Sequence, residues 1–173
     1  SNLLSKLKIS RVFLLSISFL TFIVFIVVTI FSSFIYNNSR LQLIESLYIQ
    51  AQTINQLLPE ANTNVNFDEY ANDLAISDTK FNELRVTIID KEWNVIGDSL
   101  IPYEELSSLE KHSPETRIEI QEALVNPYGT ARRTSDTTGI DLIYVAVLRD
   151  NLDPQKGLVR VAMPFDIYES FNL

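Results

Sequence analysis

The sequence of 173 residues has no cysteine, one histidine and only four glycines. The absence of cysteine excludes disulfides, thiol nucleophiles and thiolate zinc sites. A single histidine excludes metal motifs that need two, and four scattered glycines cannot form a phosphate-binding loop or a dinucleotide fingerprint. Basic residues are also few, 14 against 22 acidic ones, and this balance disfavours nucleic acid as a partner. Most soluble enzyme classes are thereby excluded.

Charge is absent from one long segment, 12–36, in which Phe, Ile, Val and Leu dominate. As a helix it would extend about 37 Å at about 1.5 Å per residue, more than the roughly 30 Å thickness of the hydrocarbon core of a bilayer. A secretory signal peptide is the alternative, but its apolar part is about 7–15 residues long and ends at a small-residue cleavage site. The end of this segment lacks such a site. The sequence therefore predicts a retained transmembrane helix over 12–36.

The two flanks of this segment differ in charge. Three basic residues precede it: Lys6, Lys8 and Arg11. The first acidic residue of the chain is Glu45, well after the segment. The positive-inside rule then predicts a cytoplasmic N-terminus over 1–11 and places everything after about Asn37 outside the cytoplasm. We expect a protein of the cell membrane with one span in this sequence.

Both ends of the sequence indicate a piece of a longer protein. Ser1 and Asn2 stand where an initiator methionine is expected, and the one methionine is Met163. The last residues, 165–173, resemble the start of a helix that would lead to a second transmembrane span.

A helical pattern continues from the apolar segment to Leu58. Five apolar residues recur at steps of 3 and 4, the spacing of a seam along one helix face: Ile44, Leu47, Ala51, Ile54 and Leu58. No glycine or proline interrupts 12–58, so anchor and stalk (37–58) are expected to form one continuous helix, which Pro59 ends. The seam either packs on its own domain or joins two chains in a parallel homodimer, and its length fits both alternatives.

Short elements follow this stalk. Asn66, with Glu69 three residues later, resembles a capping box before a short helix over 67–74. The β-branched residues of 86–89 and the pair 95–96 predict a hairpin, with Asn94 in the left-handed conformation of its turn.

A helix and three strands complete the predicted domain. The helix is expected to begin at Pro114, with Ser113 as its cap, and to end near Val125. Three strands are predicted at the end of the chain: 129–135, 140–148 and 157–164. This order of elements predicts an α+β domain over 59–164, an antiparallel sheet of five strands with the long N-terminal helix on one face.

Three parts of this domain resemble the extracytoplasmic PAS-like sensor domains often called single Cache domains. The segments 86–90 and 93–99 are similar to the hairpin pattern D-x-x-G-x-V-x-x-D-S, with Asn94 in place of its turn glycine. Residues 112–124 resemble the helix pattern H-x-x-R-P-E-I-x-x-A-L, with Ile118 in place of its proline. The segments 129–135 and 142–147 resemble the strands G-x-x-x-R-x-S and Y-V-A-V. In the family this order is typical of PhoR-like sensor histidine kinases of two-component systems.

The resemblance implies a signal-input region that passes an envelope or ligand signal across the membrane through a dimer interface. The fragment itself is expected to have no enzymatic activity and no cofactor. ATP, Mg²⁺, the phosphorelay and a response regulator are expected only for a kinase core, which the sequence lacks. A chemoreceptor or cyclase regulator would have the same outer domain, and a non-catalytic membrane-anchored interaction domain is a further alternative.

The resemblance also implies a site for a small anionic or organic ligand over one sheet face, under the segment between the second and third strands. Six residues are candidates: His112, Arg117, Arg132, Arg133, Ser135 and Tyr144. Arginine suits a carboxylate or phosphate group, and tyrosine offers one donor beside an apolar wall. Since Arg132 and Arg133 point to opposite faces of a strand, only one of them can enter such a site. Alternatively, the arginines pair with Asp136, Asp141 or Glu119, Tyr144 belongs to the core, and the stimulus is an envelope protein.

No catalytic or metal site is predicted. His112 and Ser113 are adjacent and lack the G-x-S-x-G context of a nucleophile, so a hydrolase is not expected. The acidic residues of 68–78 and 104–110 match no calcium loop and are expected on solvated faces.

Overall fold

The computed structural model describes residues 2–59, 65–77, 84–136, 139–149 and 156–165. Its compact units are 1–40 and 41–173, and each is described by itself. The predicted helix at 165–173 lies outside the described residues except for Phe165.

The first unit is formed by the N-terminal part of helix α1, which spans Asn2–Leu57. Among the described residues one helix is long and apolar enough to cross a membrane, within Arg11–Leu57, with a mean hydropathy of 2.8 in its most apolar window. Polar side chains here are satisfied within the helix, because the hydroxyls of Ser16, Thr29 and Ser33 donate to carbonyls four residues earlier. The predicted span 12–36 lies wholly inside this helix.

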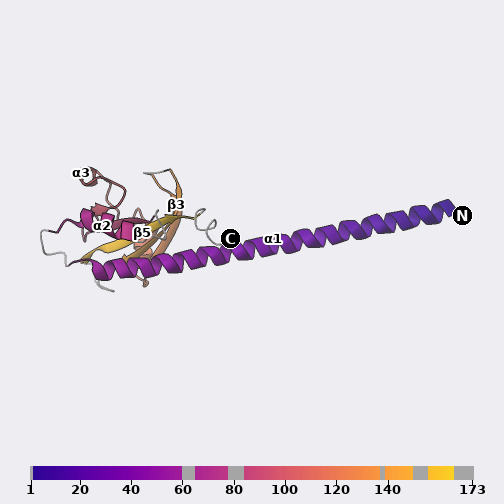
Figure 1. Ribbon diagram of the computed structural model, residues 1–173, viewed down its shortest axis with the longest axis horizontal. Helices are drawn as coiled ribbons and strands as arrows, with labels where there is room; N and C mark the ends of the chain where they lie inside the picture. The colour runs from indigo at the N-terminus through magenta and orange to yellow at the C-terminus, as the bar shows by residue number, and fades with distance from the viewer. Residues whose placement is uncertain (1, 60–64, 78–83, 137–138, 150–155, 166–173) are drawn as a thin grey trace. The chain divides into compact units, whose positions relative to one another are not determined.

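The second unit contains a five-stranded antiparallel sheet in the order β2-β1-β5-β4-β3 (Figure 1). The strands, in chain order, are β1 Arg85–Ile89, β2 Val95–Asp98, β3 Gly129–Thr134, β4 Asp141–Leu148 and β5 Leu158–Pro164. All five predicted strands are present, and with the N-terminal helix they confirm the α+β fold. The last strand lies at the centre of the sheet, which explains its continuous burial.

One face of the sheet packs against the last part of α1 and against α2, Phe67–Ser77. The predicted seam residues enter this core and are at most 8% exposed: Ile44, Leu47, Ala51, Ile54 and Leu58. They contact inward-facing residues of the strands such as Val145 and Val161. The stripe therefore packs on its own domain, one of the two alternatives that the sequence left open, and a parallel homodimer through it stays a prediction.

Helix α2 begins at the residue that the capping pattern predicts. The Asn66 side-chain oxygen accepts a hydrogen bond from the Asp68 backbone N–H. Phe67 and Ala71 are buried, whereas Tyr70 is 39% exposed. The helix packs closely on β2, since a methyl group on Gly97 would collide with the Phe67 carbonyl.

The opposite face of the sheet is covered by the segment 99–128, which contains α3, Tyr103–Leu106, and α4, Ile118–Ala123. An apolar cluster fills one end of this layer, with Ile120 of α4 against Ile89 and Leu158. Towards the other end the sheet presents buried charged side chains, which form the candidate site.

The predicted start of the helix on this side of the sheet was wrong. Helix α4 begins at Ile118, not at Pro114, because the Ser113 carbonyl accepts hydrogen bonds from the N–H groups of Thr116 and Arg117 and closes a separate turn. Arg117, in an extended conformation at φ −132°, is the residue before the helix.

In the β1–β2 hairpin the left-handed residue is Trp93, with φ 67°, and not Asn94. With Asp90, Val95 and Asp98 aligned to the hairpin pattern, Trp93 and not Asn94 stands at the position of the turn glycine. The carboxylate of Asp90 accepts hydrogen bonds from the backbone N–H groups of Glu92 and Asn94 and from the Asn94 side chain, so Asn94 is held as a ligand of that carboxylate. The Trp93 ring packs partly buried on the apolar cluster of the second face.

Candidate ligand-binding site

A cavity of about 160 Å³ lies between the second face of the sheet and the segment that covers it. Five of the six predicted site residues line it: His112, Arg117, Arg133, Ser135 and Tyr144. They come from β3, β4 and the covering segment, which the antiparallel register brings together. The other lining residues are Arg85, Ile101, Leu109, Glu110, Asp136 and Arg160.

Arg132 is the predicted residue that the structure places elsewhere. Its guanidinium pairs with Asp141 at 2.8 Å and lies 5.0 Å from the centre of the Phe165 ring. Neighbouring residues on a strand point to opposite faces, so Arg133 enters the cavity and Arg132 does not. This outcome was one of the two that the sequence allowed.

Glu119 of α4, fully buried behind the cavity, holds two of its arginines. Both terminal nitrogens of Arg133 donate to the Glu119 carboxylate at 2.7 and 2.8 Å, and Arg160 donates to it at 3.3 Å. Burial raises the pKa of Glu119, but the hydrogen bonds from Arg133 and the charges of Arg160 and Arg133 outweigh it, and the pKa lies below its usual value. Glu119 is therefore charged at neutral pH.

A second buried pair joins the first two strands beside the cavity. The Arg85 guanidinium donates to both carboxylate oxygens of Asp98 at 3.0 to 3.1 Å. The Thr87 hydroxyl also donates to Asp98, at 2.9 Å, and accepts from Arg160 at 3.3 Å. A continuous polar network thus connects β2, β1 and β5 with Glu119.

Tyr144 provides an aromatic surface for the cationic side chains. Tyr144 is 2% exposed. The guanidinium carbons of Arg133 and Arg160 lie 4.0 and 5.1 Å from the centre of its ring. Such stacking favours a cation, which helps to hold both arginines at the cavity. Tyr144 belongs to the core and to the cavity wall at once.

His112 is the one histidine, and it is uncharged at neutral pH. Burial, together with the charges of Arg160, Arg117, Arg85 and Arg133, lowers its pKa to about 2. Its backbone N–H donates to the Trp93 carbonyl at 3.0 Å, which fixes the histidine over the cavity. A neutral imidazole beside four arginines can donate one hydrogen bond without adding charge.

Three buried polar atoms of the cavity residues have no hydrogen-bond partner in the described part of the chain: Nδ1 of His112, Nε of Arg117 and Nε of Arg160. The ion pair of Arg117 is long, 3.8 Å to Asp136, whose side chain is 85% exposed. Buried polar groups are rarely left unpaired, because each costs free energy of desolvation. This arrangement fits a small ligand that accepts hydrogen bonds and carries negative charge.

The sequence prediction missed Arg85 and Arg160 because neither belongs to the motifs that carry the resemblance. A signal for Arg160 was available, since it is the one charged residue inside the apolar run of 158–163. A charged residue at such a position is expected to be paired or functional. Its partners depend on strand register, which sequence spacing does not give.

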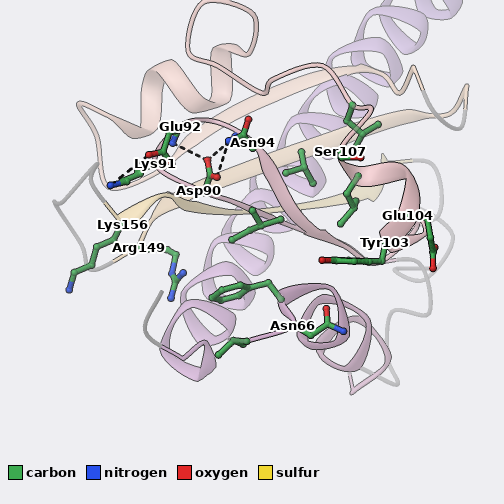
Figure 2. Close-up of a pocket in the computed structure, with 16 residues that line it drawn as sticks. Asn66, Asp90, Lys91, Glu92, Asn94, Tyr103, Glu104, Ser107, Arg149 and Lys156 are labelled. Carbon is green, nitrogen blue, oxygen red and sulfur yellow. Dashed lines mark hydrogen bonds and ion pairs between the residues drawn. The ribbon is translucent and has the colours of Figure 1, made fainter. Parts of the chain in front are cut away.

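A larger hollow of about 1270 Å³ lies at the end of the sheet, between the start of α2, the β1–β2 hairpin and α3 (Figure 2). Phe67, Ile96 and Tyr103 contribute apolar surface to it, and the buried Arg149 also lines it. The Arg149 guanidinium donates to the Pro59 carbonyl and lies 5.3 Å from the centre of the Phe67 ring. None of the six predicted ligand residues lines this hollow.

In the described parts of the chain, no three His, Asp or Glu side chains are grouped as metal ligands would be.

No family model and no curated protein matches this sequence. Among solved structures, the sensory domain of the Campylobacter jejuni chemoreceptor Tlp3 with isoleucine bound matches with a TM-score of 0.57 at 14% identity, over 79% of this chain and 58% of that one. The ligand-binding domain of the same chemoreceptor in complex with L-valine matches with a TM-score of 0.55 at 13% identity, over the same shares.

The fold is that of Cache-like sensory domains. The chain spans less than two thirds of the length of these structures, so the likeness concerns a part of them. At this identity it establishes the Cache-like fold and no ligand, since unrelated ligands are recognised on one fold.

Proposed function

We propose that this chain is the signal-input region of a membrane-bound sensor histidine kinase, with a Cache-like domain outside the cytoplasm that binds a small anionic ligand. The observation that carries the proposal is the cavity with three buried polar atoms that have no partner among the described residues, on His112, Arg117 and Arg160. The fold supports a sensory role. The cationic lining supports an anionic ligand.

A screen of small carboxylates, amino acids and inorganic oxyanions by thermal unfolding of the full chain in detergent tests the proposal. A ligand that occupies the cavity raises the unfolding temperature. In Arg117→Ala, the ligand concentration needed for the same rise in unfolding temperature should be tenfold higher or more, because the unpaired donor is lost. Arg132→Ala, outside the cavity, is the control and should leave it unchanged. Stabilisation that survives Arg117→Ala and Arg160→Ala would contradict the proposed site.

The proposed membrane topology rests on the charges before the apolar segment, Lys6, Lys8 and Arg11. It predicts that the exposed amine of Lys91 reacts with a reagent that does not cross the membrane of intact cells. Protection of Lys91 in intact cells, with labelling only after lysis, would reverse the assignment.

A homodimer is part of the proposal, because signal transfer needs an interface that can adopt two arrangements. The ligand must bind the protein more tightly in one of these arrangements than in the other. The predicted seam is buried in its own domain, so the available apolar side chains of the stalk are those that are exposed: Leu41, Ile49 and Leu57. Single cysteines at 41, 49 and 57 should form disulfides between chains more readily than cysteines at 47 and 51. Equal yields at exposed and buried positions would count against a stalk interface.

A chemoreceptor is the second candidate output, because the matching structures are sensory domains of a chemoreceptor. The same outer domain serves both outputs, and the cytoplasmic sequence separates them. A second span and a kinase core after Leu173 would support the histidine kinase, and a long helical signalling domain without a kinase core would overturn it.

A further inference from the structure

The charges around the cavity are not balanced. Four arginines line it: Arg85, Arg117, Arg133 and Arg160. Among the described residues, two buried carboxylates pair with them: Asp98 with the first, and Glu119 with both Arg133 and Arg160. Two further carboxylates line the cavity, Glu110 and Asp136, and the second lies 3.8 Å from Arg117. Both residues are exposed, so solvent screens their charges and they balance little. Two positive charges in the described lining therefore lack a buried counter-charge.

We infer that Glu119 is a positioning residue that sets the charge of the ligand. With the Glu119 carboxylate, two of the four arginine charges have no buried counter-charge, and without it three would have none. Two unbalanced positive charges fit a small ligand with two negative charges on oxygen. Such a ligand is an inorganic oxyanion or a short dicarboxylate, and about 160 Å³ excludes larger anions. This inference rests on the proposed function, and it adds the ligand's charge and the residue that determines it.

Glu119 also decides which arginine atoms are free for the ligand. It occupies both terminal nitrogens of Arg133, so the fork of that guanidinium is closed to the cavity. One terminal nitrogen of Arg160 donates to Glu119 and the other donates to the Thr87 hydroxyl. The Nε atom of Arg160 has no partner among the described residues. The donors for a dianion are then Nε of Arg160, Nε of Arg117 and the imidazole of His112. Glu119 does not line the cavity and acts through the arginines.

Packing alone gives a weaker account of Glu119. A buried carboxylate costs free energy of desolvation that its ion pairs offset only in good geometry, and an apolar side chain of similar volume often serves stability as well. Since Glu119 is fully buried, a purely structural role would not require it to be shared between two cavity arginines. The distinguishing readout is selectivity between ligand charges.

The experiment compares Glu119→Gln with the wild-type full chain in detergent, at constant ionic strength. Affinities for acetate, sulfate and malonate come from ligand-dependent thermal unfolding, followed by the fluorescence of Trp93, the one tryptophan. The added unbalanced charge should tighten binding about tenfold per ligand charge, so the preference for sulfate and malonate over acetate rises about tenfold. Glu122→Gln is the matched control, because Glu122 lies on the same helix and bonds the Thr130 N–H outside the cavity.

A second pair of variants decides the matter where Glu119→Gln does not fold. Arg133→Gln lowers the unbalanced charge by one, and the double variant Glu119→Gln/Arg133→Gln restores it. The preference for dianions should therefore fall about tenfold in Arg133→Gln and return to the wild-type value in the double variant. Comparing the affinity for sulfate with that for malonate distinguishes an inorganic oxyanion from a short dicarboxylate as the ligand.

Each outcome has one meaning. Absence of binding of all three anions by the wild-type chain overturns the proposed anion site itself. Binding with the same preference in wild type, Glu119→Gln and Glu122→Gln leaves that site intact and overturns the role of Glu119. A preference that follows the charge count through the variants supports both.

Discussion

The ion pair between Arg85 and Asp98 allows a sharp test of how burial controls electrostatics in this domain. Asp98 is fully buried and Arg85 is 4% exposed. Replacing Asp98 with Asn keeps the shape of the side chain but leaves the Arg85 charge without a counter-charge. Breaking a buried pair in this way costs about 3–5 kcal/mol of unfolding free energy. For a unit of this size the unfolding temperature should fall by roughly 10–20 °C.

The assay is thermal and urea unfolding of the full chain in detergent, with Trp93 as the fluorescent reporter of the Cache-like domain. The control is Asp141→Asn, which removes the carboxylate that pairs with Arg132 at 2.8 Å. These two side chains are 35% and 39% exposed, so the loss should stay below about 1 kcal/mol. The two pairs have similar distances and differ in burial.

A double-mutant cycle isolates the interaction itself. In an Arg85→Met background, Asp98→Asn should cost far less than in the wild type, since no buried cation is left unpaired and Asn still accepts from Thr87. Equal losses for Asp98→Asn and Asp141→Asn, or an unchanged loss in the Arg85→Met background, would refute the reasoning from burial.

Three further predictions concern pH, packing and the stalk. The His112 pKa of about 2 lies below the ordinary 6.5, so the unfolded chain binds a proton that the folded chain does not. The unfolding free energy should therefore fall by about 2 kcal/mol between pH 7 and pH 5, and a pH series on His112→Gln should lack this loss. Gly129→Ala should strongly destabilise the domain in urea unfolding, because the added methyl group collides with the Glu119 carbonyl. Leu47→Ala should cost about 2–5 kcal/mol independently of protein concentration, whereas Leu57→Ala, 59% exposed, should cost little.

The fold could be predicted from the sequence because its elements obey simple periodicities. Apart from the polar β3, the strands contain apolar runs bounded by turn residues, and all five predicted strands appear in the sheet. The errors are at the ends of helices and strands, where hydrogen bonds from outside the element determine at which residue it begins or ends. Ser113 uses its carbonyl to close a turn, which delays the start of α4, and Asp90 binds Asn94, which moves the left-handed residue to Trp93.

The candidate site was predictable only in part, for a different physical reason. Residues within the family-like motifs, such as Arg133 and Tyr144, could be placed over the sheet from the sequence. Arg160 could not, because its role follows from register: it lies opposite Thr87 on one neighbouring strand and Ala146 on the other. A small residue on one side and a hydroxyl on the other leave room for a guanidinium at the centre of the sheet. Sequence spacing within one strand carries no such information.

A row of charges runs from Asp98 on β2 through Arg85 on β1 and Arg160 on β5, all buried, to the half-buried Arg133 on β3. Such a row is an expensive way to stabilise a small domain, since apolar residues would fill the same space without desolvation of charge. It is, however, suited to couple binding to packing. An anion bound between Arg117 of the covering segment and Arg160 of the central strand would draw the two layers together. The domain would then be more stable against unfolding with ligand than without it.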